Sequence, residues 1–453
     1  MLKIKSIGLI FVFILVICGG AQAQLQWDMA DVRDIDNILP QEEQANIFNE
    51  WLEWRLDNIV PMLMKREGID MWIVMNREYN EDPLYLSMVH QPNLNARRLS
   101  VLIFHNSKQG FKKLTANWHG TSTCGDYYTP IFKDKSNGWK GQFTAIADYI
   151  KKSDPQKIGL NFSEHWQFGD GLSAGLLHEI ETALDKKYQA RIVSAENLCI
   201  GWLETRSPEQ LKMYRNIIGI GHDLIKEFFS NQVIVPGVTT TNDVVWWIRD
   251  RIANLGLKAW FQPSISIQRS PVEAAQYGKE DRVIRRGDLL HCDVGFKYLG
   301  LCTDQQHNAY VLRIGETAPP KGLQELLHRG NRLQEIFLNE FKEGRTGNEI
   351  YLSALKIAKA EGLKPRIYTH PIGVHGHAAG PTLGLYEDQD GVPVAGDYPL
   401  YQDTCYSIEL SAAYEVPEWG NQLVNMGLEE EAVFTKDGGQ WIDGYQTKLY
   451  LIK

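Results

Sequence analysis

The sequence predicts two folded domains, the first of them an α/β domain over residues 24–202. The chain has 453 residues, which is more than one hydrophobic core usually organises. Strand-like and helix-like stretches alternate up to about residue 200, as is typical of an α/β domain. From about residue 203 the pattern changes to long amphipathic helices and separate strand-like runs, which indicates a second domain over residues 203–453.

The first residues have the features of a secretory signal peptide. Two lysines precede the apolar run "IGLIFVFILVIC", and Ala21 and Ala23 form a small-x-small cleavage site. We therefore expect residues 1–23 to be removed and the remainder to be exported, to a periplasm or out of the cell. No later segment approaches the roughly 20 apolar residues of a membrane span. The alternatives are an uncleaved anchor and a lipoprotein attached through Cys18, although Ile17 stands where a lipoprotein signal has a small residue.

Composition narrows the class of protein and of partner. A hydrophobic fraction of 43% is ample for two cores and argues against long disorder. The net charge of −9, without a long basic run, argues against nucleic acid or an anionic membrane as the partner, because both require clustered Lys and Arg. The five cysteines after Cys18 are scattered and show no CxxC spacing, which indicates buried thiols and not a disulfide framework or a zinc knot.

The elements of the first domain follow from periodicity. The stretch "PQEEQANIFNEWLEWRLDNIVPMLMKREG" has apolar residues at helical spacing and ends at Gly68, a typical helix stop. Strand-like runs are expected at residues 69–76, 97–106 and 157–162, and a helix at residues 173–184. The polar positions of this domain form no recognisable constellation.

Two helices open the second domain. Ser207 is a candidate N-cap in front of Pro208, and a long amphipathic helix follows. The stretch "VPGVTTTNDVVWWIRDRIANLG" repeats this design, with a turn, a Thr/Asn cap region and a helix closed by Gly256.

The stretch "LLHCDVGFKYLGLCTD" places two aspartates in an otherwise largely apolar run. It has the pattern of a β-hairpin that turns at Tyr298 and Leu299, and this register sets Asp293 directly opposite Asp304, with Cβ atoms about 4.5–5.5 Å apart. The same register places Cys302 on the aspartate face. Two ionised carboxylates so placed repel each other unless one is protonated or a cation lies between them. A divalent metal ion resolves this repulsion; a surface hairpin with solvated acids is the alternative.

Three later stretches contain further residues of the metal-ligand type. The loop "THPIGVHGHAAGP" contains His370, His375 and His377 among glycines and prolines, so its backbone can pass close to a ligand. Glu409 lies inside the strand-like run "CYSIELSA", and Glu429 begins the run of three glutamates in "GLEEEAVFTKDGG". Taken singly, a buried Glu paired with a base and a solvated run of glutamates are the simpler interpretations.

Together these residues resemble the family that includes methionine aminopeptidase, aminopeptidase P and prolidase, the pita-bread metallopeptidases. Asp293 and Asp304 are eleven residues apart, as the first two ligands of the family are, and "HPIGVHGH" matches the family's H-x-x-G-x-x-x-H. Glu409 in "YSIEL" matches the glutamate of the family's T-I-E-P strand, and Glu429 matches the final ligand of E-D-T-V-x-V-T-x-D-G. The resemblance implies an α/β N-terminal domain followed by an α+β pita-bread catalytic domain.

The resemblance also implies a cofactor, a substrate and a role for each residue. The cofactor would be two divalent metal ions, Mn, Zn, Co or Fe, which share a bridging water. Asp293 would bind one ion, His370 and Glu409 the other, and Asp304 and Glu429 would bridge them. Glu409 would also accept the proton of the attacking water, and His377 would contact the substrate and stabilise the developing negative charge. His375 would either line the pocket or pack against it.

The expected reaction is hydrolysis of a peptide bond near the amino terminus of a short peptide, by an aminopeptidase or dipeptidase, with Xaa-Pro peptides as the narrower expectation. Relatives often form dimers, which makes a homodimer the expected assembly. Two alternatives keep the fold. One is a pita-bread protein that binds a peptide or partner without cleaving it, and the other is a creatinase-like hydrolase of a small guanidino or amide compound.

The sequence departs from the family on the substrate side. Gln276 stands where members usually have another substrate-contacting histidine, and Gly427 stands where proline-directed members often have Arg. Glu430 replaces the usual Asp after the last ligand. Of the remaining side chains near the motifs, His291 and His307 are interpreted as core histidines, with support of the metal ligands as the alternative. Residues 386–390 are interpreted as a solvated loop.

Overall fold

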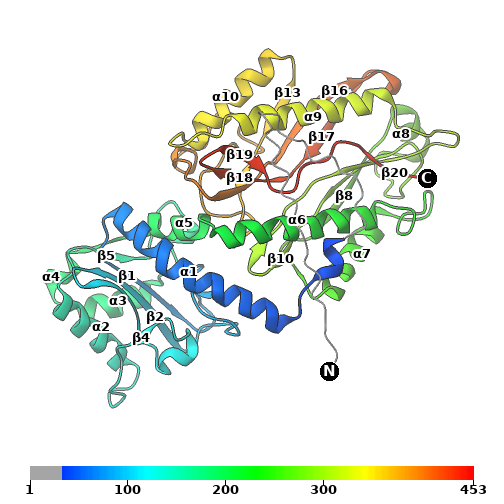
Figure 1. The fold of residues 1–453 in the computed structure, drawn as a ribbon. Coiled ribbons are helices and arrows are strands. Elements are labelled where there is room, and N and C mark those ends of the chain that lie inside the picture. Colours follow the sequence, from blue (N-terminus) through cyan, green and yellow to red (C-terminus); the bar gives the residue numbers. More distant parts are fainter. Residues whose placement is uncertain (1–32) are drawn as a thin grey trace, which may run out of the picture.

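The computed structural model describes residues 33–453 and divides them into two lobes (Figure 1). The predicted signal peptide, residues 1–23, lies outside the described residues. None of the helices within residues 33–453 combines the length and the apolar character that a membrane crossing requires. The predicted domain boundary after residue 202 falls within helix α5 (Glu196–Glu204), which ends the N-terminal lobe.

The N-terminal domain is built on a six-stranded sheet with the order β4-β3-β2-β1-β5-β6. Its strands are β1 (Met71–Arg77), β2 (Leu99–Ser107), β3 (Gly110–Thr115), β4 (Thr129–Pro130), β5 (Ile158–Leu160) and β6 (Ile192–Ser194). Its helices are α1 (Gln41–Glu67), α2 (Lys140–Ser153), α3 (Ala174–Ala183), α4 (Lys186–Gln189) and α5. The helices and strands predicted for this domain are therefore confirmed.

Both faces of this sheet are buried, because alternate side chains of β1 enter different cores. Trp72 and Val74 pack with residues of α1 and α5, whereas Met71, Ile73 and Met75 pack with residues of α2 and α3. This two-residue alternation follows from the pleat of a strand. Helices on both faces make the domain a three-layer unit, and the predicted α/β class is confirmed.

Helix α1 connects the two domains. It runs from the C-terminal lobe along the N-terminal sheet and ends at Gly68, whose φ of 64° is the left-handed conformation of a helix stop (Figure 1). Before its first turn, the backbone N–H of Leu39 donates a hydrogen bond of 2.9 Å to the hydroxyl of Tyr298 in the C-terminal domain. The hairpin that contains Tyr298 is thus fixed against the N-terminal helix.

The C-terminal domain combines five helices with four small sheets. The helices are α6 (Pro208–Phe228), α7 (Thr241–Asn254), α8 (Pro271–Tyr277), α9 (Lys321–Asn339) and α10 (Gly347–Ala360). The sheets have the orders β20-β12-β9-β8, β13-β16-β17, β14-β15-β18-β19 and β11-β10-β7. Their strands are β7 (Lys258–Ala259), β8 (Ser264–Gln268), β9 (Leu289–Asp293), β10 (Phe296–Tyr298), β11 (Leu301–Cys302), β12 (Asn308–Val311), β13 (Lys364–Ile367), β14 (His370–Pro371), β15 (Thr404–Ser407), β16 (Leu410–Val416), β17 (Gln422–Leu428), β18 (Glu431–Thr435), β19 (Gly438–Trp441) and β20 (Tyr450–Ile452).

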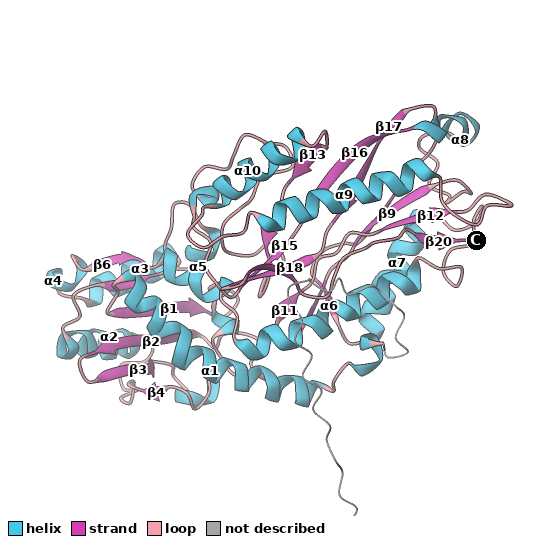
Figure 2. Cartoon of the chain, turned by 45° about the horizontal axis from the view of Figure 1, so that its top comes forward, coloured by secondary structure: helices cyan, strands magenta, loops and turns pink. Residues whose placement is uncertain are grey.

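The sheets lie between two pairs of helices (Figure 2). Apolar residues of α6 and α7 form one core with β9 and β12, and apolar residues of α9 and α10 form another with β16 and β17. Helix α6 begins as predicted, since the Ser207 hydroxyl accepts from the N–H of Gln210 and the Gln210 side chain accepts from the N–H of Ser207. Helix α7 has the same capping box, formed by Thr240 and Asp243.

The hairpin that carries the two aspartates turns one residue later than predicted. Tyr298 pairs with Leu301, so the turn consists of Leu299 and Gly300 instead of Tyr298 and Leu299. Leu299 has a φ of 51° and Gly300 a φ of 78°, the positive values that a two-residue hairpin turn requires at both positions. Glycine adopts such values without strain, and this fixes the turn.

The shifted register changes how the aspartates face each other. Val294 bridges Gln305, so Asp304 lies opposite Gly295 and diagonal to Asp293 on the same face. The prediction that the two aspartates are directly opposite is therefore wrong, although they still share a face because the shift preserves the alternation of the strands.

All five cysteines within the described residues are free and buried. The prediction of buried thiols is confirmed for this part of the chain. The Cys302 thiol points to the carbonyl of Val374 at 3.7 Å and belongs to none of the groups of candidate metal ligands that the described residues form.

The turn at Gly300 gives a first test. A Cβ at Gly300 would lie 2.9 Å from the Phe48 ring of α1, whereas a Cβ at Gly237, which also has positive φ (86°), would meet nothing within 4 Å. We expect Gly237→Ala to lower the free energy of unfolding by about 1–2 kcal/mol through backbone strain alone. Gly300→Ala should lower it by about 1–3 kcal/mol more through overpacking. Equal losses in urea denaturation would contradict the packing of α1 on this turn.

Candidate metal centre

Five side chains from four separate parts of the C-terminal domain meet in one buried cluster. They are the predicted metal ligands Asp293, Asp304, His370, Glu409 and Glu429. Their ligand atoms form overlapping groups, within each of which all atoms lie within 4.8 Å of one another: Asp293 with Asp304 and Glu429, and His370 with Glu409 and Glu429. Glu429 belongs to both groups, as a residue shared between two neighbouring positions would.

The cluster forms where strands of different sheets end. Asp293 is the last residue of β9, Glu429 lies between β17 and β18, and a bridge between Gln306 and Glu429 joins the two regions. Glu409 was predicted inside a strand but lies in the break between β15 and β16, where its N–H donates to the Ser407 carbonyl at 2.9 Å. Because the chain passes there from one sheet to another, the regular alternation of side chains is interrupted.

The carboxyl groups of the cluster lack charge compensation from the protein. Asp293 Oδ1 and Asp304 Oδ1 are buried and have no hydrogen-bond partner among residues 33–453. Burial raises the pKa of Asp293 to about 6, and burial together with the Glu429 carboxyl raises the pKa of Glu409 to about 9. Burial and the neighbouring carboxylates also raise the pKa values of Asp304 and Glu429. An oxygen-rich set of this kind fits a divalent cation, which would compensate the negative charge and be coordinated by the oxygens that lack hydrogen-bond partners.

The imidazole of His370 is oriented as a metal ligand would be. Its Nδ1 lies 2.9 Å from the Pro371 carbonyl, which can only accept a hydrogen bond, so Nδ1 carries the proton. Its Nε2 lies 3.3 Å from Glu429 Oε1 and 3.6 Å from Asp304 Oδ2, and it has no hydrogen-bond partner among the described residues, so a neutral ring would turn the Nε2 lone pair toward these oxygens. A lone pair that faces carboxylate oxygens is unfavourable unless a cation lies between them.

Gln306 supports the cluster and was not predicted. Its Nε2 donates to Glu409 Oε1 at 2.6 Å and to Glu429 Oε2 at 2.7 Å, so one amide group holds two of the candidate ligands. Its Oε1 lies 2.9 Å from His291 Nε2, which fixes the orientation of the amide. His291 therefore supports the candidate metal ligands through Gln306, which was the alternative given for it. The available signal was strand periodicity, because Gln306 is two residues after Asp304 and shares its face.

Gly427 explains one departure from the family pattern. A Cβ at this position of β17 would lie 2.8 Å from His291 Nε2 and 3.0 Å from Gln306 Oε1. A side chain at residue 427 would therefore collide with the pair that supports Glu409 and Glu429. Glycine here and glutamine at residue 306 are structurally coupled.

Of the two remaining predicted histidines, the structure brings His377 beside the cluster. Its ring lies edge-on to His370 with a centroid distance of 4.6 Å, and its ligand atoms group with Asp304 and His370. Burial, with a contribution from His370, lowers the pKa of His377 to about 4, so the ring is neutral near pH 7. Gly376 allows this placement, because a Cβ there would lie 2.2 Å from the Trp260 ring.

His375 faces the N-terminal domain. Its ring stacks on Phe168 with a centroid distance of 4.8 Å, and its Nε2 lies 3.3 Å from the Pro83 carbonyl. His375 thus packs between the two domains, and its expected contact with substrate stays a prediction. Gln276, which replaces the family's further histidine, is exposed on α8.

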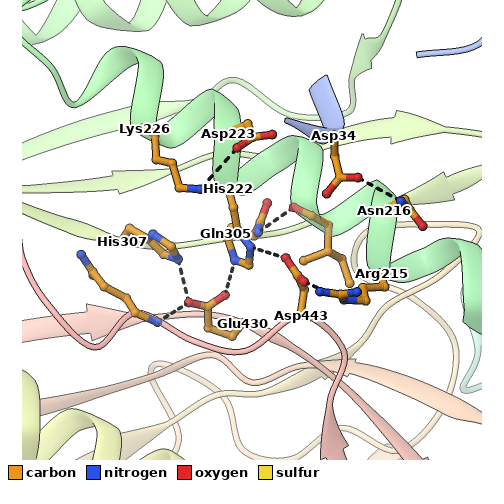
Figure 3. Close-up of polar contacts among 12 residues, drawn as sticks. Asp34, Arg215, Asn216, His222, Asp223, Lys226, Gln305, His307, Glu430 and Asp443 are labelled. Carbon is orange, nitrogen blue, oxygen red and sulfur yellow. Dashed lines mark hydrogen bonds and ion pairs between the residues drawn. The ribbon is translucent and has the colours of Figure 1, made fainter. Parts of the chain in front are cut away.

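The residue after Glu429 is held by a buried network of its own (Figure 3). Glu430 accepts hydrogen bonds from His222 Nε2 at 2.9 Å, from His307 Nε2 at 2.6 Å and from the N–H of Gln446 at 2.9 Å. His222 Nδ1 also faces Asp443 Oδ2 at 2.9 Å, so both of its ring nitrogens carry protons. The interpretation of His307 as a satisfied core histidine is confirmed, whereas the interpretation of the three glutamates as a solvated run is wrong, since all three are buried.

Electrostatics reinforce this network. Burial by itself would lower the pKa of His222, but Glu430 and Asp443 outweigh it and raise the pKa to about 9. Burial would raise the pKa of Glu430, but His307 and His222 lower it to about 2. His222, His307 and Glu430 also have the spacing of metal ligands, yet their facing atoms already bond to one another. We therefore assign them a structural role behind Glu429.

A cavity of about 710 Å³ adjoins the cluster. Gln306, His291 and Gly427 line it, together with Tyr368 and Tyr386. Tyr386 is exposed, as expected for a solvated loop, and its ring also packs edge-on against Tyr368 with a centroid distance of 5.0 Å. A second cavity, of about 730 Å³, lies in the N-terminal domain, and none of the predicted site residues lines it.

Comparison with known proteins agrees with this architecture. Residues 212–436 match metallopeptidase family M24. An X-Pro aminopeptidase from Thermotoga maritima is similar over 85% of this chain and 99% of its own, with 17% identity and a TM-score of 0.59. An Xaa-Pro dipeptidase from Bacillus anthracis (18% identity, TM-score 0.57) and a dipeptidase from Pyrococcus horikoshii (17%, 0.58) are each similar over 88% of this chain and over 99% and 100% of their own. No curated protein sequence matches the chain. The predicted fold class, an α/β domain followed by an α+β pita-bread domain, is confirmed.

The raised pKa values predict that metal binding depends on pH. In the metal-free protein, Asp293 and Glu409 hold protons up to about pH 6 and about pH 9, above their values of about 4 in an unfolded chain. The folded state then binds more protons than the unfolded state in this window, so its stability falls as pH rises through it. A bound cation displaces these protons and so removes this loss of stability at higher pH.

We therefore expect Mn²⁺ to raise the unfolding temperature more at about pH 8 than at about pH 5, where protons compete with the ion. Differential scanning calorimetry with and without excess Mn²⁺ measures this. Glu409→Gln should reduce the pH dependence, because it removes the group with a pKa of about 9. Equal stabilisation by Mn²⁺ at both pH values would contradict the assignment of the cluster as a cation site.

The network around Glu430 gives a separate prediction. His222→Ala removes a charged partner of the buried Glu430 and of the half-buried Asp443, and it should lower the free energy of unfolding by about 3–5 kcal/mol. The pKa of His222 is raised on folding, so its contribution is complete below about pH 6.5 and is lost as pH rises through about 9. The difference between wild type and variant in urea denaturation should shrink accordingly. His178→Ala, at an exposed histidine of α3, should change stability little at any pH.

Proposed function

The chain belongs to metallopeptidase family M24, and we propose that it hydrolyses a peptide bond near the amino terminus of short peptides, with two divalent metal ions bound by the clustered side chains. The observation that carries this proposal is the convergence of four carboxyl groups and one imidazole in a buried cluster with unpartnered oxygens. A non-catalytic binding protein would have no need for such a costly arrangement.

The overlapping groups support a specific distribution of ligands. Asp293 would bind one ion, His370 and Glu409 would bind the other, and Asp304 and Glu429 would bridge the two. The ions, when bound, would supply Lewis acidity and a water of lowered pKa. Mn, Co, Zn or Fe fits a set that has no thiolate ligand.

The protein's own groups would move the proton and hold the substrate. Glu409 is suited to accept the proton of the attacking water, because burial and Glu429 favour its protonated form. Gln306 donates a hydrogen bond to Oε1 of this carboxyl group and so limits its rotation. His377 would act as a neutral hydrogen-bond donor to the carbonyl oxygen, since burial and His370 lower its pKa and so favour the neutral ring.

The residue preference of the enzyme is the narrower part of the proposal. Two of the similar structures are peptidases that act on Xaa-Pro bonds. In this chain Gln276 is exposed and Gly427 leaves no side chain where proline-directed members often have Arg. We therefore propose short peptides as the substrate class and Xaa-Pro peptides as one group within it.

We also propose that the protein acts after export, in a periplasm or outside the cell, on the basis of the signal-peptide pattern of residues 1–23. A homodimer remains the expected assembly, by resemblance to the family. A creatinase-like hydrolase that works without metal is the less supported alternative, because the full ligand set is present.

Activity on a defined panel of peptides tests the proposal. Purified protein with Mn²⁺ or Co²⁺ should release free amino acids from dipeptides and tripeptides, including Xaa-Pro members. Asp304→Asn should abolish the release, because it removes a bridging charge, and Asp250→Asn, at an exposed position of α7, should not. His377→Ala should lower kcat by about 100- to 1000-fold with the metal content unchanged. Metal-loaded protein that releases nothing from any peptide would refute the proposal.

A further inference from the structure

We propose that the cavity beside the metal centre is a receptor for a carboxylate group of the substrate, and that Arg366 on β13 is the residue that recognises it. This inference rests on the proposed peptidase function and narrows its substrates to peptides whose terminal or side-chain carboxylate reaches this cavity. It assigns to this chain a specificity residue at a position outside the motifs of the metal centre.

The charge of the cavity is the first observation. Of its 14 lining residues, three are Lys or Arg and none is Asp or Glu. The whole chain has a net charge of −9, and the neighbouring cluster consists mainly of carboxyl groups. A positive cavity in an acidic protein selects for an anionic ligand group, since the local potential decides which charge is attracted.

The position of the cavity is the second observation. Gln306 lines the cavity and donates hydrogen bonds to both Glu409 and Glu429. Tyr368 also lines it, and the N–H of Tyr368 donates to the Glu409 carbonyl at 3.1 Å. Two residues of the cavity wall, Gln306 and Tyr368, therefore contact the residue proposed as the general base, so the cavity adjoins the cluster. A peptide whose scissile bond lies at the cluster would extend its remaining residues into this space.

The geometry of Arg366 is the third observation. Its guanidinium lies over the Tyr386 ring at 4.5 Å from the centroid, a contact that restricts its motion. It forms no ion pair with any described carboxylate, whereas Lys364 in the same cavity is paired with Glu415 at 2.9 Å. Among the cations of this cavity, Arg366 thus combines a defined orientation with free donors. A guanidinium can bind both oxygens of one carboxylate, which an ammonium group cannot do as well.

Matched pairs of peptides test the inference. The first pair is Ala-Ala-Ala as the free acid and as the carboxyl-terminal amide. The second pair, Ala-Asp-amide and Ala-Asn-amide, places a carboxylate on a side chain only. We expect wild type to have a kcat/KM at least about 10-fold higher for the charged member of one pair, chiefly through KM, as a charge-assisted hydrogen bond to substrate would give. The pair that shows the difference identifies the terminal or the side-chain carboxylate as the ligand, and either result supports the receptor.

Variants then connect the preference to Arg366. Arg366→Gln should bring the ratio of kcat/KM between the charged and the uncharged peptide of the pair close to one. Arg366→Lys should retain part of this preference. Arg329→Gln is the matched control, because Arg329 also lies over a tyrosine ring, that of Tyr414, at 4.5 Å but does not line the cavity. This control should preserve the ratio. Unchanged unfolding temperature and Mn²⁺ content would show that Arg366→Gln is folded, as expected for an exposed residue.

The outcomes separate this inference from the proposed function. Equal kcat/KM values within both pairs, or a preference that survives Arg366→Gln, would overturn the receptor while leaving the peptidase intact. If no peptide is hydrolysed, the proposed function fails. Calorimetry with the uncleavable reduced-bond analogue of Ala-Ala-Ala, as acid and as amide, then decides the receptor alone. Tighter binding of the acid that Arg366→Gln removes would support it, and equal binding would refute it.

Discussion

Four carboxyl groups share one buried cluster, and their mutual repulsion is the constraint on which the rest of the catalytic domain depends. Burial and proximity raise the pKa values of Asp293, Asp304, Glu409 and Glu429, which means that their ionised forms are costly in the absence of a cation. A fold can maintain such a cluster only if other interactions stabilise it, or if a bound ion compensates the charge. The surrounding structure supplies such stabilising interactions, and the carboxyl groups are arranged so that they could bind an ion.

The stabilising interactions form two layers behind the cluster. Gln306 connects Glu409 with Glu429, and His291 fixes the orientation of Gln306 in space that the absence of a side chain at Gly427 provides. On the other side, His222 and His307 hold Glu430 ionised and so fix the backbone next to Glu429. Two residues beside the cluster that depart from the family pattern thus fit other residues of this chain. Gly427 leaves room for Gln306 and His291, and Glu430 binds His222 and His307. Gly427 also lines the cavity that contains Arg366.

The N-terminal domain contributes to the site through contacts with the catalytic loops. Tyr298 in the aspartate hairpin accepts a hydrogen bond from Leu39, and the ring of His375 stacks on Phe168. These contacts fix both the hairpin of Asp293 and Asp304 and the loop of His377 against the first domain. The two-domain arrangement is therefore part of how the metal centre and its cavity are positioned.

The sequence by itself determined the order of the elements and the identity of the clustered side chains. Helix stops such as Gly68, caps such as Ser207 and the spacing of Asp293, Asp304 and His370 depend on short-range patterns, which a sequence displays directly. Only the tertiary structure decided the hairpin register, because one residue of shift depends on whether Leu299 and Gly300 or their neighbours adopt positive φ. It also decided the roles of Gln306, His291 and Arg366, since a hydrogen bond or a cavity wall between residues far apart in the chain has no local signature.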